Sequence, residues 1–271
     1  MRLKRFTVAQ RVFHLLAMLS FLFQALTGFA ALFFNTAWGR GTAGVFGGYE
    51  GLLHWHKNVG FFMIGLFLVH VIYVLVKIDW KRFPGSLFGP DSLMPRPTDI
   101  KQFFQHVGWM IGVAEEPRFD RWGYWEKFDY WAVFWGMVII GGTGLILAMP
   151  LAASRIMPGW MFNVALWVHR IEAMLAVAHL FIIHFFIAHL RRRSFPMDLA
   201  MTQGDVDLTH ANHEKAAWVE RLRSEGRLES LTRADRPAAV KVISYAFGLA
   251  MVALGVYILI IGITHAPYAS W

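Results

Sequence analysis

Residues 163–193 read NVALWVHRIEAMLAVAHLFIIHFFIAHLRRR, and this stretch decides the fold class of the chain. It is apolar over more than twenty positions, which is long enough for a helix to cross a bilayer whose hydrocarbon core is about 30 Å thick. The stretch nevertheless contains four histidines, at positions 169, 179, 184 and 189. Because ionisable side chains are costly inside a membrane, their presence here indicates a function.

His169 and His184 are predicted to share one broad face of this helix. They are 15 residues apart, which corresponds to about 22 Å along the helix axis and about 60° around it. His179 lies about 280° around the helix from His169 and points elsewhere. Two imidazoles on one face, one near each membrane surface, predict two metal centres stacked across the bilayer.

The composition extends this prediction to the whole chain. Of its 271 residues, 56% are hydrophobic and only 16% are charged, as is typical of a polytopic membrane protein. The absence of cysteine excludes disulfides, iron–sulfur clusters and covalently attached c-type haem, so a metal must bind to imidazole or carboxylate. Further apolar stretches predict membrane spans over about residues 12–34, 52–78, 128–149 and 240–263.

We therefore predict an all-α polytopic membrane protein with three parts. Residues 1–190 form a four-helix transmembrane bundle, which includes a polar cytoplasmic loop at 79–127. Residues 191–239 form a cytoplasmic basic segment, with an amphipathic helix around residues 210–226. Residues 240–264 form a fifth transmembrane helix. No internal sequence repeat is evident.

The distribution of positive charge predicts the orientation in the membrane. Of the 26 Lys and Arg residues, 22 lie in residues 1–11, 77–127 or 191–241. Positively charged loops stay in the cytoplasm, so we predict a bacterial inner-membrane protein with a cytoplasmic N-terminus and a periplasmic C-terminus. The formal net charge of +8 then reflects membrane orientation and does not indicate nucleic-acid binding.

This orientation brings histidines from different spans to two depths. His56 and His169 are expected near the outer surface, whereas His14, His70 and His184 are expected near the inner surface. Facing imidazoles in a four-helix bundle can enclose a flat cofactor, and ligation by two imidazoles suits haem iron that transfers electrons. The pattern predicts a haem-binding bundle with two haems about 20 Å apart, in which His14 or His70 is the partner of His184.

Four short motifs resemble those of a known family. The motifs are R-V-F-H at 11–14, which is followed by Thr27-Gly28, H-K-N-V-G at 56–60, K-F-D-Y-W at 127–131 and H-L-F-I-I-H at 179–184. Over about residues 5–205, the chain resembles the membrane cytochrome b subunits of formate dehydrogenases (the gamma subunit), thiosulfate reductases and hydrogenases. The resemblance implies two b-type haems, one ligated by His56 and His169 and the other by His14 and His184.

The chain departs from that family pattern in three ways. The interval between His169 and His184 is one residue longer. His70 is a further candidate at the depth of the inner haem, in place of His14. A fifth span follows the basic segment, where the formate dehydrogenase type ends after four.

The resemblance also implies a quinone site beside the inner haem, near the stretch PRFDRWGYWEKFDYW at 117–131. The aromatic rings of this stretch are suited to stacking on menaquinone or ubiquinone. Histidine is included among the candidates because imidazole titrates near neutral pH. The predicted quinone-binding residues are Asp120, Tyr124, Lys127, His70 and His189.

The predicted function is that of a dihaem b-type cytochrome, an electron-transfer subunit of a quinone-linked respiratory oxidoreductase complex. It would pass electrons between the quinone pool and a periplasmic partner, either a multihaem cytochrome c or an iron–sulfur or molybdenum enzyme subunit. The alternative is a non-redox transporter or a proton relay that uses the intramembrane histidines. We find no nucleophile–base set or phosphate-binding loop, so the chain is not expected to catalyse bond formation alone.

Overall fold

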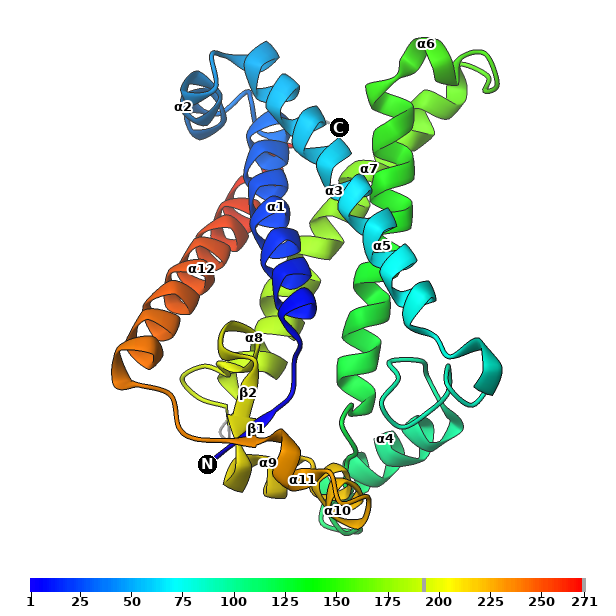
Figure 1. Cartoon of the computed structure of the whole chain (residues 1–271). Coiled ribbons are helices and arrows are strands. Elements are labelled where there is room, and N and C mark those ends of the chain that lie inside the picture. The colour runs from blue at the N-terminus through cyan, green and yellow to red at the C-terminus, as the bar shows by residue number, and fades with distance from the viewer. Residues whose placement is uncertain (192–193, 270–271) are drawn as a thin grey trace.

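The computed structural model describes residues 1–191 and 194–269, and within them it contains five helices that are long and apolar enough to cross a membrane (Figure 1). The predicted all-α fold with five spans is therefore confirmed. The fourth spanning helix changes character along its length, since α7 continues without a break into the π-helical segments η2 and η3. The spans are α1 (Val8–Leu32), α3 (Tyr49–Lys77), α5 (Tyr124–Ala148), α7 (Trp160–Ala178) with η2 (His179–His184) and η3 (Phe186–Leu190), and α12 (Ala238–His265).

The first four spans form two helical hairpins. The helix α1 packs most extensively on α3, and α5 packs most extensively on α7. Short helices lie at the connections of both hairpins, on the same end of the molecule (Figure 1). These are α2 (Ala37–Val45) between α1 and α3, and α6 (Pro150–Ala153) between α5 and α7. We call this end the far end of the bundle.

The fifth span, α12, packs against the bundle through three glycines spaced seven residues apart. A Cβ atom at Gly248 would lie 2.1 Å from Met197 Sδ, and one at Gly255 would lie 2.2 Å from Phe181 Cε1. Gly262 meets Phe29 in the same way, at 2.6 Å from Cε2. A spacing of seven keeps residues on one face of a helix. This face of α12 therefore lets large side chains of α1, of η2 and of the segment around Met197 pack directly against its backbone.

The polar end of the molecule, opposite the far end, has its own small core. Its centre is a three-stranded antiparallel sheet of order β2-β1-β3, in which Leu3 is paired with Val206 and Thr232. Segments remote in sequence thus fold together: the N-terminus, the loop before α5 and residues 197–236 (Figure 1). We call this layer the cap. Its strands and helices are β1 (Arg2–Lys4), β2 (Asp205–Asp207), β3 (Thr232–Arg233), α8 (Ala200–Gln203), α9 (Leu208–Glu214), α10 (Ala216–Ser224) and α11 (Leu228–Leu231).

The amphipathic helix expected over residues 210–226 is divided into α9 and α10 by a break at Lys215. The buried Lys215 ammonium pairs with Glu126, which also pairs with Arg5. Glu126 lies in the first turn of α5 and accepts the backbone N–H of Gly123 at 2.7 Å. This ion-pair cluster joins the cap to the bundle. Burial lowers the pKa of Lys215 despite the opposing effect of the Glu126 carboxylate.

The loop between α3 and α5 contains η1 (Trp80–Arg82) and α4 (Pro97–Met110), which lies against the start of α5. A single buried ion pair fixes this contact. The Lys127 ammonium donates to both carboxylate oxygens of Asp99, at 2.9 and 2.8 Å, and only 2% of its side chain is exposed.

Candidate functional site

The structure brings two pairs of histidines close together inside the bundle. His56 of α3 and His169 of α7 have their ring centroids 6.4 Å apart. His14 of α1 and His184 of η2 have theirs 6.3 Å apart. We call these the far-end pair and the cap-end pair, respectively. Both are pairs that the family resemblance implied.

The ring separations fit a metal held between two imidazoles. A metal–nitrogen bond of about 2.0 Å on each side, plus about 1.1 Å from each nitrogen to its ring centre, gives a centroid separation of about 6.2 Å. Among the described residues, no group of three or more His, Asp and Glu side chains is arranged to hold a metal ion. The bundle therefore offers sites with two protein ligands, which suit a haem that supplies its own four equatorial nitrogens.

The hydrogen bond to His56 fixes which of its nitrogens faces its partner. The Thr27 hydroxyl donates to the Phe23 carbonyl oxygen at 2.8 Å. Its oxygen is thus left to accept from His56 Nδ1–H, also at 2.8 Å. With the proton on Nδ1, the lone pair of Nε2 is free to bind a metal. Gly28 permits this approach, because a Cβ atom there would lie 3.2 Å from His56 Cε1.

The same arrangement recurs around His169. The Thr143 hydroxyl donates to the Ile139 carbonyl oxygen at 2.7 Å and lies 3.1 Å from His169 Nδ1. A Cβ atom at Gly144 would lie 3.3 Å from His169 Cε1. Each hairpin therefore has a Thr-Gly pair on its first helix that positions a histidine on its second. Thr27-Gly28 belongs to the motifs recognised in the sequence, whereas Thr143-Gly144 was not predicted to matter, although the repeated Thr-Gly dipeptide was an available signal.

The cap-end pair has a charged support that sequence reasoning also missed. The Nδ1–H of His184 donates to Asp129 Oδ2, and His179 Nε2–H donates to Asp129 Oδ1 at 2.8 Å. A carboxylate that accepts from the non-ligating nitrogen fixes the imidazole orientation and makes the ligand more basic. Asp129 lies in the K-F-D-Y-W motif, but its position relative to His184 depends on the shape of the helix.

That shape is π-helical over His179–His184. In an α-helix, residues five apart are separated by about 140° of rotation, and their side chains cannot reach one carboxylate. In a π-helix, residue i is hydrogen-bonded to residue i+5. His179 and His184 therefore lie on nearly the same side of the helix, one turn apart, and both side chains reach Asp129. The wide turn also accommodates the additional residue between His169 and His184. Packing alone, which the sequence suggested for His179, does not describe its environment.

His70 is placed away from both pairs. Its Nε2 lies 3.1 Å from the Tyr130 hydroxyl of α5, and its ring contacts Phe13 with the centroids 5.3 Å apart. Tyr130 precedes Thr143 by 13 residues, as His14 precedes Thr27. The His70–Tyr130 pair of α3 and α5 thus corresponds in position to the His184–His14 pair of η2 and α1.

The remaining residues predicted for a quinone site are divided between two surroundings. Asp120 is paired with Arg221, with Oδ1 2.8 Å from Nη2, and Lys127 is paired with Asp99. His189 lies beyond His184 in η3, with its ring against Phe185 at a centroid distance of 5.9 Å. The structure does not bring the charged groups of Asp120 and Lys127 together with an imidazole.

Tyr124, by contrast, belongs to an aromatic cluster at the start of α5. Its hydroxyl lies 3.0 Å from Nδ1 of His106, a residue of α4 that the sequence analysis had not selected. Burial lowers the pKa of His106, so its imidazole is neutral at neutral pH. Trp125 packs on His106 with the centroids 5.6 Å apart, and the Arg191 guanidinium lies 5.3 Å from the Trp125 ring. Since Arg191 follows η3, the cluster adjoins the end of the helix that carries His184.

A family model described as prokaryotic cytochrome b561 matches residues 5–204. This range contains the first four spans, of which α1, α3 and α7 with η2 carry the two histidine pairs, and it ends before α12. The match confirms the predicted resemblance to membrane cytochrome b proteins. A comparison with curated proteins gives no match.

Proposed function

The chain belongs to the prokaryotic cytochrome b561 family, and from this premise we propose that it is a dihaem electron-transfer subunit. Membership makes it a membrane b-type cytochrome. The proposal adds that His56 with His169, and His14 with His184, each hold one haem b. The observation that carries it is the spacing of the two ring pairs, 6.4 and 6.3 Å between centroids.

The haems would supply one-electron transfer, and the protein's own residues prepare their sites. Thr27 accepts the Nδ1 proton of His56, and Thr143 shares that of His169 with the Ile140 carbonyl oxygen, so that both Nε2 lone pairs would be free to bind iron. Asp129 does the same for His184 with a full negative charge. Because two imidazoles of the protein would hold each haem, each centre would be suited to passing electrons and not to binding a substrate.

We propose that the cap end faces the cytoplasm and the far end faces the periplasm, in line with the distribution of Lys and Arg. Electrons would then pass between a quinone and a periplasmic redox subunit, such as a multihaem cytochrome c or a subunit of an iron–sulfur or molybdenum enzyme. For the quinone we favour the cluster of Tyr124 and His106, whose hydrogen-bonded pair can exchange a proton with a quinone oxygen. His70 and His189 remain candidates, whereas Asp120 and Lys127 already have charged partners.

Quantification of haem in the purified full chain tests this proposal. We expect two haems b per chain, with a reduced b-type α-band, and one haem per chain in His169→Ala. His54→Ala is the matched control, since it removes an exposed histidine of α3 that belongs to neither pair, and it should retain two haems. A wild-type chain without an α-band would contradict the proposal and favour the alternative, a proton relay. Full haem content in His169→Ala would contradict the far-end pairing.

A further inference from the structure

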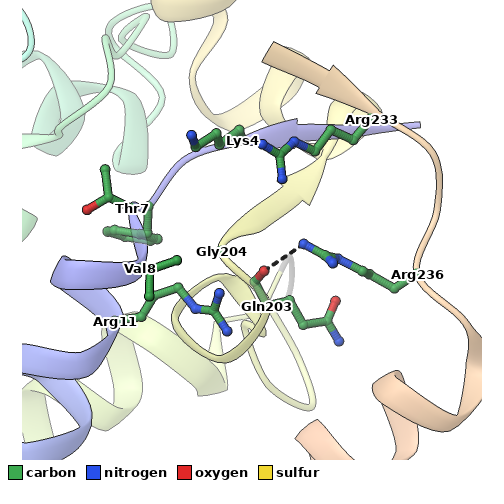
Figure 2. Close-up of a pocket in the computed structure, with 9 residues that line it drawn as sticks. Lys4, Thr7, Val8, Arg11, Gln203, Gly204, Arg233 and Arg236 are labelled. Carbon is green, nitrogen blue, oxygen red and sulfur yellow. Dashed lines mark hydrogen bonds between the residues drawn. The ribbon is translucent and has the colours of Figure 1, made fainter.

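A hollow of about 140 Å³ lies at the cap end, where two spans enter the membrane. One wall is the start of α1 at Val8, and another is the segment Arg233–Arg236, which ends two residues before α12 begins. Four positively charged side chains surround the hollow (Figure 2). They are Lys4, Arg11, Arg233 and Arg236.

The positive charge around the hollow is largely uncompensated. In the part of the chain that the structure describes, Arg236 pairs with Asp205, which Arg2 also engages, whereas no acidic residue pairs with Lys4, Arg11 or Arg233. The guanidinium of Arg11 donates only to backbone carbonyl oxygens, at Met201 and Thr202. The N-terminus of α1, a helix of 25 residues, adds further positive potential at Val8.

The hollow also contains a buried amide that has no partner within the described residues. Gln203 is only 3% exposed, and neither its Nε2 nor its Oε1 forms a hydrogen bond. Such a group costs free energy unless something binds to it. The backbone turn beside it is fixed by Gly204, which has a φ of +85° and accepts the N–H groups of Arg5 and Phe6. Gln203 thus lines the hollow with an amide whose hydrogen-bonding capacity is unused among the described residues.

We propose that this hollow binds the phosphodiester group of an anionic membrane phospholipid. Guanidinium groups match phosphate oxygens with paired N–H donors, and the Gln203 amide can donate to a phosphate oxygen or accept from a headgroup hydroxyl. Basic pockets at the ends of membrane spans are suited to anionic headgroups. The position of the hollow at the start of a membrane span favours a lipid over free phosphate. Val8, which lines the hollow, is 70% exposed and is the first residue of an apolar span.

Binding of three compounds to the delipidated full chain in neutral detergent tests the source of the phosphate. The probes are phosphatidylglycerol, phosphatidylcholine and inorganic phosphate at matched ionic strength. Dissociation constants come from native mass spectrometry, and the melting temperature comes from tryptophan fluorescence. We expect phosphatidylglycerol to bind and to raise the melting temperature, with little effect of the other two. An equal effect of inorganic phosphate, or of phosphatidylcholine, would overturn the assignment to an anionic lipid.

Charge-neutralising variants locate the site. Lys4→Gln/Arg233→Gln should weaken phosphatidylglycerol binding by about 30-fold, from the contribution of each cation at a membrane surface. The matched control is Lys101→Gln/Arg223→Gln, which removes two exposed cations at the same end of the molecule but outside the hollow. Equal weakening in both double variants would show that attraction is general and would overturn the site. The haem spectrum of each variant verifies that the bundle is intact.

A third variant separates ligand binding from folding. Because the Gln203 amide lacks a partner among the described residues, Gln203→Met should leave the lipid-free melting temperature unchanged or higher. The rise in melting temperature on addition of phosphatidylglycerol should nevertheless become smaller. If the lipid-induced rise is the same as in the wild type, the amide does not contact the headgroup and the proposed site is wrong.

Discussion

Replacement of Asp129 by Asn should raise the midpoint potential of one haem and leave the other unchanged. The Asp129 carboxylate accepts from His184, and its negative charge stabilises the oxidised, more positive iron relative to the reduced iron. Asn keeps the size of the side chain but removes the charge. The redox state that loses more stabilisation is therefore the oxidised one, so the reduced state becomes favoured and the potential rises.

The magnitude follows from the hydrogen bond. A hydrogen bond to a charged group contributes about 1.5–3 kcal/mol. A change of about 1.4 kcal/mol corresponds to about 59 mV for a one-electron couple. If this contribution is felt mainly in the oxidised state, Asp129→Asn raises the potential of the cap-end haem by about 60–120 mV.

Optical redox titration of the purified chain measures both potentials in one sample, with the haem content determined beside it. Thr143→Val is the complementary variant, because it removes one of the two neutral partners of His169 Nδ1 at the far end and leaves the Ile140 carbonyl oxygen at 3.2 Å. This variant should shift the midpoint potential of the far-end haem only. The shift should be smaller than in Asp129→Asn, since a neutral hydrogen bond contributes about 0.5–1.5 kcal/mol. Equal shifts of both potentials in Asp129→Asn, or no shift in either, would refute the placement of Asp129 behind a haem ligand.

Three further variants test the cap-end ligand, the quinone cluster and the connection of the cap to the bundle. His14→Ala should lose one haem, whereas His70→Ala, which removes the partner of Tyr130, should keep two; haem quantification showing the reverse would replace His14 by His70. Tyr124→Phe should slow quinone-linked turnover by about tenfold, a modest fraction of the usual effect of a proton-transferring group, while both haems stay reducible by dithionite. Asp120→Asn is the control for Tyr124→Phe. Slower quinone-linked turnover in Asp120→Asn alone would place the quinone site beside Arg221 instead. Glu126→Gln should leave Arg5 and Lys215 buried without their ion-pair partner, with Glu214 as a remaining counter-charge. A cost of about 3 kcal/mol, the lower end for a broken buried pair, lowers the melting temperature by about 6–12 °C. Glu220 forms an exposed pair with Arg118, so Glu220→Gln should change the melting temperature little. An equal change in Glu126→Gln and Glu220→Gln would contradict a structural role for the buried cluster.

The sequence was sufficient for the five spans and for the depths of the histidines, because both depend only on hydrophobic length and on the rise of a helix. The sequence left open whether His14 or His70 is the partner of His184. The direction in which a side chain points depends on how its helix is rotated about its axis, and that rotation is set by packing against the neighbouring helices. In the structure, His14 faces His184, and Tyr130 faces His70. The ligand roles themselves remain predictions.

The supports of the site were harder to predict, for reasons that are local. The contact of Asp129 with His179 and His184 requires a π-helical turn, and a calculation at 100° per residue places these two histidines on different faces. The cap was not predicted as a folded unit, because its core joins Leu3, Trp122 and Trp218 across more than 200 residues of chain. The ion pairs of Asp120 and Lys127 likewise depend on partners supplied by distant loops.

The paired Thr-Gly cradles are part of a repeat within this bundle. The two hairpins match position by position: His14 and Tyr130 each stand 13 residues before a Thr-Gly pair, and His56 and His169 each rest on one. His70 follows His56 by 14 residues, and His184 follows His169 by 15, with the difference absorbed by the π-helical turn. The two hairpins therefore repeat one pattern of residues, a repeat that the sequence prediction had not found. The repeat is broken at the cap end, because His14 faces His184 whereas the equivalent Tyr130 faces His70.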